Sequence, residues 1–254
     1  MDRLKGKVAM VVGAGSIGPG WGNGKATAVT FAREGASVFC VDRNGAAAEE
    51  TVKIITEEGG KAAAFTADVS RASEVEAMVA ACLKAYGRID VLDNNVGIAE
   101  VGSVVEVAEA EWDRVFAVNL KSAYLSMKHV IPVMIKQGGG SIINVASING
   151  VSPGEFQGIY SVTKAAVISM TKVFAKECAQ FGIRCNALLP GLTDTKFASA
   201  LTKNDAILKH ALQRIPLKRV ADPSEMAGAV LYLASEASSY TTGVALNVDG
   251  GFLA

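Results

Sequence analysis

The sequence VVGAGSIGPGWGNGKATAVTFAREGASVFCVD, residues 11–42, joins two short apolar runs through a glycine-rich turn and an amphipathic segment. This order of strand, glycine turn, helix and strand is typical of a βαβ unit that binds a dinucleotide. Six glycines fall between residues 13 and 24. Two assignments of the phosphate-binding loop compete for them.

The first assignment places the motif G-x-G-x-x-G at residues 13–18. The third glycine of that motif belongs to the first helical turn, but here Pro19 and three more glycines follow it, and such a run is a poor helix. We therefore predict that Gly13 leaves the first strand and that Gly22-Asn23-Gly24 begins the helix, with its free N–H groups facing a diphosphate. Residues 17–21 are then an insertion in the loop. A glycine turn without a ligand is the alternative.

Asp42 closes the second apolar run. A carboxylate at that position can accept hydrogen bonds from both ribose hydroxyls of an adenosine, and it would repel a 2′-phosphate. The sequence therefore favours NAD as the cofactor over NADP. Arg43 follows directly and could pair with a phosphate, which leaves NADP open.

Seven apolar runs alternate with longer helical patterns along the chain. The runs cover residues 7–12, 37–41, 62–66, 89–95, 141–147, 183–189 and 244–248, and the helical patterns cover 24–34, 45–58, 71–86, 109–136, 160–180 and a segment beginning near Asp222. Strands that are apolar on both faces and alternate with helices indicate a parallel sheet covered on both sides. We predict an α/β, three-layer doubly wound Rossmann fold with a seven-stranded parallel sheet. Residues 1–254 are expected to form a single NAD(P)-binding domain.

Local signals support these boundaries. Glycines at positions 35, 59, 87, 138 and 182 each follow a helical pattern, where a left-handed closing residue is needed. The sequence DPSE at 222–225 predicts a capped helix start. Residues 191–218 are polar and break the alternation, and we expect two short helices there that form a lid over the ligand.

Composition excludes several classes of ligand. The chain has 25 basic and 25 acidic side chains, so no global field favours nucleic acid or an anionic membrane. Neither a signal-peptide pattern nor an apolar stretch of membrane-spanning length occurs, and we expect a cytoplasmic protein. The four cysteines lack C-x-x-C spacing and there are only two histidines, so we expect reduced, packed thiols and no metal site.

A second constellation lies in the second half of the chain. Tyr160 and Lys164, in the sequence YSVTK, are four residues apart and therefore share one face of a helix. Ser147 ends the preceding apolar run, at the edge where a parallel sheet presents ligands. An exposed helical pair and a strand-end cap are the alternatives for these residues.

Taken together, these segments resemble the short-chain dehydrogenase/reductase family of the Tyr-x-x-x-Lys type over essentially the whole chain. The resemblance rests on the glycine loop, Asn119 in VFAVNLKSAY, Ser147 in IINVASING, the sequence YSVTK, and the segments ADVS at 67–70, DNNVG at 93–97 and NVDGG at 247–251. Val12, Val96 and Ala146 depart from the usual pattern of the family. None of these departures removes a catalytic group.

The resemblance implies four catalytic residues. Tyr160 would exchange a proton with the alcohol oxygen, with Lys164 and the oxidised nicotinamide favouring its anion, because a free tyrosine has a pKa of about 10. Ser147 would hydrogen-bond the reacting oxygen, and Asn119 would hold a water that links the lysine to solvent. Tyr160 and Lys164 would also contact the nicotinamide half of the cofactor.

The resemblance also implies further cofactor-binding residues. Asp68 and Val69 match positions beside the adenine, and Asn95 matches a position near the adenosine ribose. Thr193 and Thr195 match positions that hold the nicotinamide carboxamide and a phosphate oxygen. Ordinary loop packing is the alternative, for Val69 especially.

From these features we expect an NAD-dependent oxidoreductase that interconverts a secondary alcohol and its carbonyl. The substrate would be a small molecule, a sugar, polyol, hydroxy acid or cyclic alcohol, bound by residues 97–101, 149–157 and 192–215. The polar lid favours a polyol, sugar or hydroxy acid over a steroid. The alternatives are an NADPH-dependent 3-oxoacyl reductase and a non-catalytic NAD-sensing protein. By the same resemblance, the helices at 109–136 and 160–180 would join four copies in a homotetramer.

Overall fold

A computed structural model describes residues 2–254 of the chain, apart from the side chain of Ala200. Seven strands form one sheet in the order β3-β2-β1-β4-β5-β6-β7, and every pair of neighbours is parallel. The strands are β1 Val8–Val12, β2 Ser37–Asp42, β3 Lys61–Thr66, β4 Val91–Asn94, β5 Gly140–Val145, β6 Ile183–Pro190 and β7 Ala245–Val248. The predicted doubly wound fold and its seven-stranded parallel sheet are confirmed.

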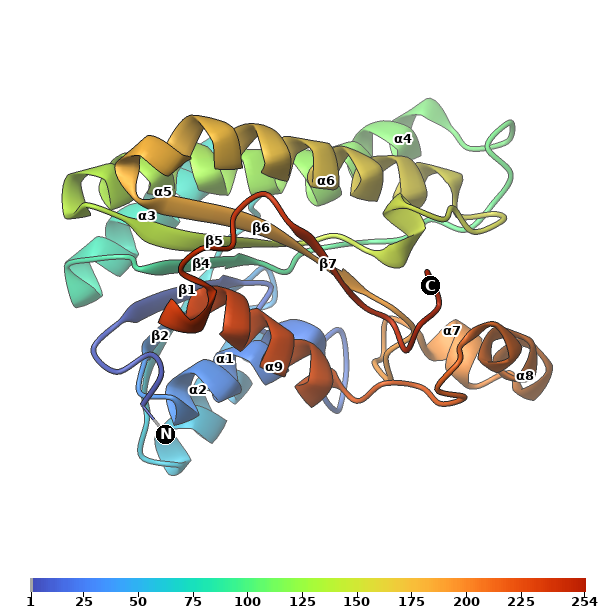
Figure 1. The fold of residues 1–254 in the computed structure, drawn as a ribbon, viewed down its shortest axis with the longest axis horizontal. Helices are drawn as coiled ribbons and strands as arrows, with labels where there is room; N and C mark the ends of the chain where they lie inside the picture. Colours follow the sequence, from blue (N-terminus) through green and yellow to red (C-terminus); the bar gives the residue numbers. More distant parts are fainter. Residues whose placement is uncertain (1) are drawn as a thin grey trace.

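Helices cover both faces of this sheet (Figure 1). One layer contains α1 Asn23–Arg33, α2 Gly45–Glu57 and α9 Pro223–Ala234, and the other contains α3 Ala72–Tyr86, α4 Glu109–Phe116, α5 Ser122–Gln137 and α6 Gly158–Cys178. Alternate residues of β1 pack into the two layers, with Met10 in one apolar cluster and Val11 in the other. Because both faces are buried, the strands are apolar throughout, as the sequence predicts.

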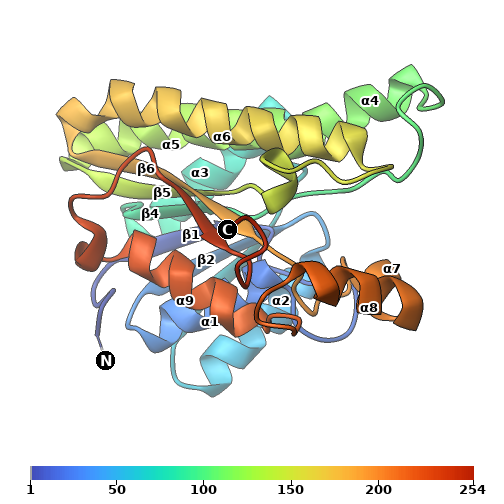
Figure 2. The same cartoon turned by 45° about the vertical axis from the view of Figure 1, so that its right-hand side comes forward.

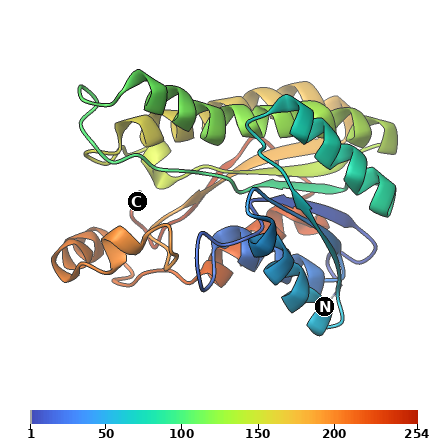
Figure 3. The same ribbon diagram turned by 180° about the vertical axis from the view of Figure 1, so that it is seen from behind.

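The order in which strands are added to the sheet reverses between β1 and β4, and the loops that follow β1, β4 and β5 meet at this point of the carboxyl edge. Two short helices, α7 Ser199–Thr202 and α8 Asp205–Arg214, lie in the predicted lid segment. They project from the layered body beyond the carboxyl ends of the strands (Figure 2), and the view from behind shows the same separation (Figure 3). This edge therefore combines the glycine loop, the candidate catalytic residues and the lid.

The local sequence signals match the observed helix ends. The five glycines predicted to close helices all have positive φ, between 71° and 87°. Asp222 and Glu225 form a capping box with Pro223 as the first residue of α9. Within residues 2–254, no helix is both long enough and apolar enough to cross a membrane.

One predicted helix differs from the structure. Residues 109–136 were expected to form a single regular helix, but α4 and α5 are separated by a π-helical turn, Ala117–Lys121. This wider turn contains Asn119, whose side chain hydrogen-bonds both the backbone N–H and the carbonyl of Ile98. Such turns are often found at functional sites, and the tertiary contacts that stabilise this one leave no periodic signal in the sequence.

Candidate active site

Ser147 and Tyr160 meet where β5 and α6 approach each other. Ser147 follows β5, and its hydroxyl oxygen caps a 3₁₀ turn, Ile148–Gly150, by accepting a hydrogen bond from the Asn149 N–H at 3.1 Å. Tyr160 lies in the first turn of α6, and the nearby Ser147 side chain lowers the pKa of its phenol. The two hydroxyl groups that the sequence placed at the reaction centre are thus neighbours, and both side chains are buried.

Lys164 lies one helical turn beyond Tyr160, as the i, i+4 spacing predicts. Its Nζ is 5.6 Å from the centroid of the Tyr160 ring and donates a hydrogen bond to the Val145 carbonyl at 2.8 Å. Burial lowers the pKa of Lys164 to about 8. A Cβ at Gly97 would lie only 3.2 Å from this Nζ, so the glycine after β4 leaves room for the ammonium.

The protonation of the Tyr160 phenol is set by two opposing effects. Burial raises its pKa above the ordinary value, and the Ser147 side chain lowers it. In the cofactor-free chain the phenol is therefore neutral near pH 7 and suited to donate a proton. It can accept a proton only where nearby positive charge stabilises its anion, and Lys164 is the protein group placed to do so.

Asn119 connects three parts of the site. Its Oδ1 accepts a hydrogen bond from the Ile98 N–H at 2.8 Å, and its Nδ2 donates to the Ile98 carbonyl at 2.9 Å and to Thr163 Oγ1 at 3.0 Å. Thr163 in turn donates to the Tyr160 carbonyl. Sequence reasoning missed Thr163, although its place beside Lys164 on a buried helix face was a usable signal. The water-holding role of Asn119 stays a prediction.

The glycine loop has the geometry of the second assignment. Gly13 follows β1 with φ of +86°, Gly22 is the extended N-cap, and α1 begins at Asn23 with no side-chain cap. A Cβ at Gly24 would overlap the Gly13 carbonyl oxygen, so only glycine lets the helix start this close to the strand end. The first N–H groups of α1 have no side-chain cap, and the helix starts directly against the end of β1. Free N–H groups in this position suit the diphosphate of a dinucleotide.

The insertion of residues 17–21 is fixed in place by Lys25. The Nζ of this buried lysine donates to the Gly20 carbonyl at 3.2 Å and to Glu50 at 2.7 Å, and it lies 5.6 Å from the Trp21 ring centroid. At its other end the insertion reaches the lid, since a Cβ at Gly18 would lie 3.4 Å from the Cγ of Lys196. The insertion thus connects α2 to the lid segment.

Asp42 ends β2, as predicted, and its carboxylate faces the glycine loop. One carboxylate oxygen accepts a hydrogen bond from the Gly15 N–H at 3.0 Å, and the other accepts from the Asn44 N–H at 2.9 Å. A Cβ at Gly15 would be 2.9 Å from this carboxylate and 2.6 Å from the Cβ of Ala47. The second glycine of the cluster therefore keeps the acidic side chain close to the loop.

The remaining predicted cofactor residues have these contacts within the protein. Asp68 accepts hydrogen bonds from the N–H and hydroxyl of Ser70, and Val69 packs in the core. Asn95 donates a hydrogen bond to Asp93. Thr193 donates to the Gly191 carbonyl, and Thr195 accepts from the Ala198 N–H. All of them follow strands at the carboxyl edge of the sheet. Their contacts with a dinucleotide stay predictions.

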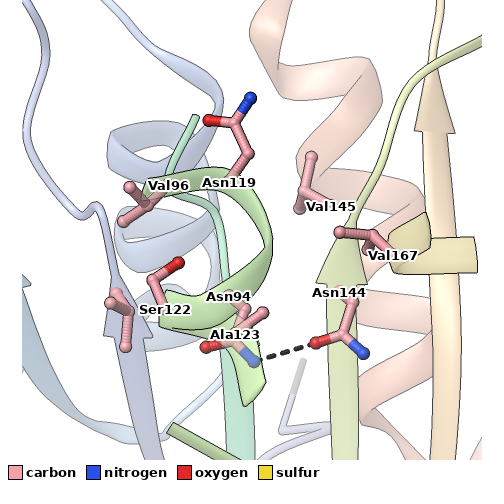
Figure 4. Close-up of a pocket in the computed structure, with 9 residues that line it drawn as sticks. Asn94, Val96, Asn119, Ser122, Ala123, Asn144, Val145 and Val167 are labelled. Atoms are coloured by element: carbon pink, nitrogen blue, oxygen red, sulfur yellow. Dashed lines mark hydrogen bonds between the residues drawn. The ribbon is translucent and has the colours of Figure 1, made fainter. Parts of the chain in front are cut away.

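A small cavity of about 10 Å³ lies beside the catalytic residues, between the ends of β1, β4 and β5. It has room for roughly one water molecule. Figure 4 shows Asn94 and Asn144 joined by a hydrogen bond, with Asn119 pointing away from them. The cavity is therefore lined by polar side chains from β4, from β5 and from the helix turn that carries Asn119.

Comparisons with known proteins agree with this architecture. A family model described as enoyl-(acyl carrier protein) reductase matches residues 18–253. The 3-oxoacyl-[acyl-carrier-protein] reductase FabG of Thermotoga maritima is 41% identical over 251 residues, which cover 99% of each chain. The 2,5-dichloro-2,5-cyclohexadiene-1,4-diol dehydrogenase LinX of Sphingobium indicum is 37% identical over 251 residues, 99% of this chain and 98% of LinX.

Solved structures agree as well. The structure of a 7α-hydroxysteroid dehydrogenase in complex with NADH and 7-oxo glycochenodeoxycholic acid has a TM-score of 0.93 and 32% identity, covering 98% of this chain and 95% of that one. A structure from Beutenbergia cavernae, described as that of an NAD(P)-dependent gluconate 5-dehydrogenase with NADP bound at low occupancy, has a TM-score of 0.92 and 36% identity, covering 98% of both chains.

The chain belongs to the short-chain dehydrogenase/reductase family. It is an NAD(P)-dependent oxidoreductase that acts on CH–OH groups. A bound NAD(P) supplies the nicotinamide carbon that accepts or returns a hydride. The glycine loop and Asp42 would hold its adenosine diphosphate half, and Tyr160 and Lys164 would lie at its nicotinamide half.

Proposed function

We propose that the protein is an NAD-dependent dehydrogenase for a cyclic secondary alcohol. The observation that carries this proposal is a set of exposed apolar side chains in the segments expected to bind substrate. Phe156 is 63% exposed, Val151 58% and Phe197 41%. The Phe197 ring lies 6.0 Å from the Tyr160 ring, and so next to the proposed proton donor. Exposed apolar side chains in the segments expected to bind substrate favour a compact apolar substrate over a sugar or hydroxy acid.

Phe156 has a second unusual property, because its φ of +58° is rare for a bulky residue. The strained backbone is held by a bridge between Gly102 and Gln157 and by a hydrogen bond from the Gly102 N–H to the Phe156 carbonyl at 2.9 Å. Strain retained beside an active site is often part of its function. Here it directs an aromatic ring outward where a substrate ring would bind.

In the proposed reaction, Ser147 and Tyr160 bind the substrate oxygen together. During alcohol oxidation the phenolate of Tyr160 accepts the proton of the substrate hydroxyl, while the carbon that bears the hydroxyl loses a hydride, for which a bound NAD⁺ would be the acceptor. Lys164 stabilises the phenolate before the transfer. During reduction the neutral phenol returns the proton. Residues 191–218 close over the substrate as a lid, and Phe197 is the lid residue that reaches Tyr160.

The preference for NAD rests on Asp42. Its carboxylate is held at the end of β2 against the Gly15 N–H, where it would face the adenosine ribose and repel a 2′-phosphate. A protein that only senses NAD would have no need of the Ser147, Tyr160 and Lys164 arrangement. The complete catalytic set therefore supports an enzyme over an NAD-sensing module.

An NADPH-dependent 3-oxoacyl reductase is the second candidate. It is supported by the 41% identity to FabG of Thermotoga maritima. The names of LinX and of the 7α-hydroxysteroid dehydrogenase instead support a cyclic alcohol, since both describe enzymes for ring hydroxyls. Two similar structures are described as gluconate dehydrogenases, and these names support a sugar acid, which the substrate panel below includes among the hydroxy acids.

A substrate and cofactor panel tests the proposal. We expect the highest kcat/KM with NAD⁺ and hydroxylated rings such as cyclohexanols or hydroxysteroids, compared with polyols, sugars, hydroxy acids and, in reverse, 3-oxoacyl thioesters with NADPH. Phe197→Ala should raise KM for the best ring substrate about tenfold, as expected for the loss of one buried aromatic contact. The matched control is Phe181→Ala, an exposed aromatic at the opposite edge of the sheet. A best rate with the thioester and NADPH would contradict the proposal.

We also infer that four copies assemble through α4, α5 and α6. A groove of about 840 Å³ runs over these helices and is lined by Phe116, Leu120, Tyr124, Met170 and Val173 among others. An apolar groove on a helical layer suits the same helices of a second copy, because two-fold contacts are self-complementary. Sedimentation should give a tetramer mass, and Val173→Asp should reduce it. A monomeric wild-type protein would refute this inference.

A further inference from the structure

A carboxyl group is buried in the centre of the sheet. Asp93 lies on β4 between β1 and β5, and none of its surface is exposed. Its Oδ2 accepts a hydrogen bond from Asn95 Nδ2 at 3.0 Å, whereas Oδ1 has no hydrogen-bond partner within the described part of the chain. No salt bridge among residues 2–254 includes it. A buried carboxyl group without a full set of partners lowers the stability of the fold, which suggests that Asp93 has a functional role.

The surroundings of Asp93 are uncharged. Side chains alternate along β4, so Asp93 faces the α1 layer, opposite Asn94, which lines the cavity of Figure 4. On this side Val11 of β1 and Ile143 of β5 are its strand neighbours. The helix α1 of the same layer includes two polar side chains, Asn23 and Thr27. Each of these two side chains also has a buried oxygen with no hydrogen-bond partner in the structure.

The titratable groups of the neighbouring elements are engaged elsewhere or stay neutral. Burial raises the pKa of the Cys40 thiol on β2 to about 12. Lys25 of α1 pairs with Glu50, and the Asp42 carboxylate accepts from backbone N–H groups. On α9, Glu225 pairs with Arg219. The uncharged surroundings explain why burial raises the pKa of Asp93 to about 7.

The partner of Asp93 touches both ends of the dinucleotide loop. The Asn95 N–H donates to the Val12 carbonyl at 2.8 Å, directly before Gly13. A Cβ at Gly13 would lie 3.1 Å from the Asn95 carbonyl carbon and oxygen, and a Cβ at Gly24 would lie 3.4 Å from the Asn95 Cβ. Asn95 is therefore wedged between the end of β1 and the first turn of α1, which together form the phosphate-binding loop.

We propose that Asp93 is a positioning residue for NAD(P): its carboxyl group orients the Asn95 side chain and thereby fixes the spacing of Gly13 and Gly24 around the cofactor diphosphate. The carboxyl group does not touch the cofactor. It acts through one hydrogen bond to a residue that packs against the loop. The effect on the enzyme is therefore on cofactor affinity and not on the chemical step.

The charge of Asp93 makes this role pH-dependent. As the pH rises through neutrality, the carboxyl group ionises without a cation to balance it. The negative charge then lies beneath the site of an anionic diphosphate, and the unpartnered oxygen attracts N–H or O–H groups of the surrounding elements. Both effects weaken cofactor binding at higher pH.

Titration of NADH into the full-length protein between about pH 5.5 and 9, followed by fluorescence, tests the proposal. If NADPH binds more tightly, it replaces NADH. We expect the wild-type Kd to rise about three- to tenfold across this range, with a midpoint near the pKa of about 7. Asp93→Asn keeps an oxygen for Asn95 and should abolish this rise while retaining the low-pH affinity. Lys164, with a pKa of about 8, titrates in the same pH range. It is present in both the wild type and Asp93→Asn, so a difference between their pH profiles comes from Asp93.

Asp93→Leu removes the hydrogen bond and should raise Kd about tenfold at every pH, with kcat at saturating cofactor within about twofold of wild type. Cys82→Ala, a buried core variant of α3 away from the loop, is the control for general destabilisation. The proposal is overturned if Asp93→Asn has the wild-type pH profile, or if Asp93→Leu changes Kd no more than Cys82→Ala does. Should Asp93→Leu fail to fold, the comparison with Asp93→Asn alone decides.

Discussion

Lys164 passes across the face of Tyr160 and is anchored beyond it, with Nζ 5.6 Å from the ring centroid and 2.8 Å from the Val145 carbonyl oxygen. The ammonium is therefore held by the strand that carries Ser147. Burial favours the uncharged forms of both side chains, since it raises the pKa of Tyr160 and lowers that of Lys164. The phenol is therefore neutral until it exchanges a proton with the substrate oxygen, and the buried ammonium beside it lowers the stability of the fold.

Replacing the phenol tests its role directly. Tyr160→Phe removes the proton donor and leaves the ring, so kcat should fall by about 10³-fold or more, at the upper end of what general acid–base catalysis contributes. Cofactor affinity should change less than about threefold, because the ring packing is kept. Stopped-flow turnover and NADH titration measure the two quantities. Full turnover in this variant would remove Tyr160 from the reaction.

Replacing the buried Lys164 should abolish activity but make the fold more stable, because burial of its ammonium is unfavourable. The folded-state pKa of about 8 lies below the ordinary 10.5, so between these values the unfolded chain binds more protons and wild-type stability rises with pH. Below pH 8 the ammonium carries its full desolvation penalty. Lys164→Met should therefore be inactive but more stable than wild type at pH 7, by about 1–3 kcal/mol, with the gain lost near pH 10.5.

Urea unfolding of the cofactor-free proteins at pH 7 and near pH 10 checks this expectation. Lys172→Met, an exposed lysine on the same helix, is the matched control and should show no such pH-dependent gain. A Lys164→Met variant that is less stable than wild type at pH 7 would show that the bond to Val145 outweighs the desolvation penalty.

Gly97 sets the space available to the ammonium. A Cβ there would lie 3.2 Å from Lys164 Nζ, so Gly97→Ala should displace the lysine and reduce kcat by about tenfold, in line with the cost of small misplacements in active sites. Gly228→Ala in α9 is the control, because a Cβ added there would meet no atom within 4 Å apart from the helix's own backbone and the two neighbouring residues. It should leave kcat unchanged and stabilise α9 by about 1 kcal/mol. Equal kcat values for the two variants would contradict the proposed crowding.

Much of the fold and of the catalytic centre was predictable from local sequence. The alternation of apolar and amphipathic segments predicts every strand, and the poor helix propensity of residues 18–22 explains why α1 begins only at Asn23. The hydrogen bond between Thr163 and Asn119 was missed, because it spans 44 residues. The burial of Asp93 was missed as well, because it depends on β1 and β5, which come from other segments. The π-helical turn at Asn119 likewise depends on bonds to Ile98 across 21 residues. Periodicity reports which face of an element is buried, but it does not report which side chains meet there.

Asp42 gives the last prediction, on cofactor preference. Asparagine keeps an oxygen that can accept from the Gly15 N–H but lacks the charge that repels a 2′-phosphate, so Asp42→Asn should shift the ratio of kcat/KM for NADP⁺ over NAD⁺ upward by about 10- to 100-fold. Most of the change should appear in KM for the cofactor, since Asp42 is far in sequence and fold from Tyr160. Glu57→Gln, an exposed acid at the end of α2, controls for the loss of one negative charge. If both variants keep the wild-type ratio, the end of β2 does not select the cofactor, and Arg43 with the inserted loop becomes the region to test.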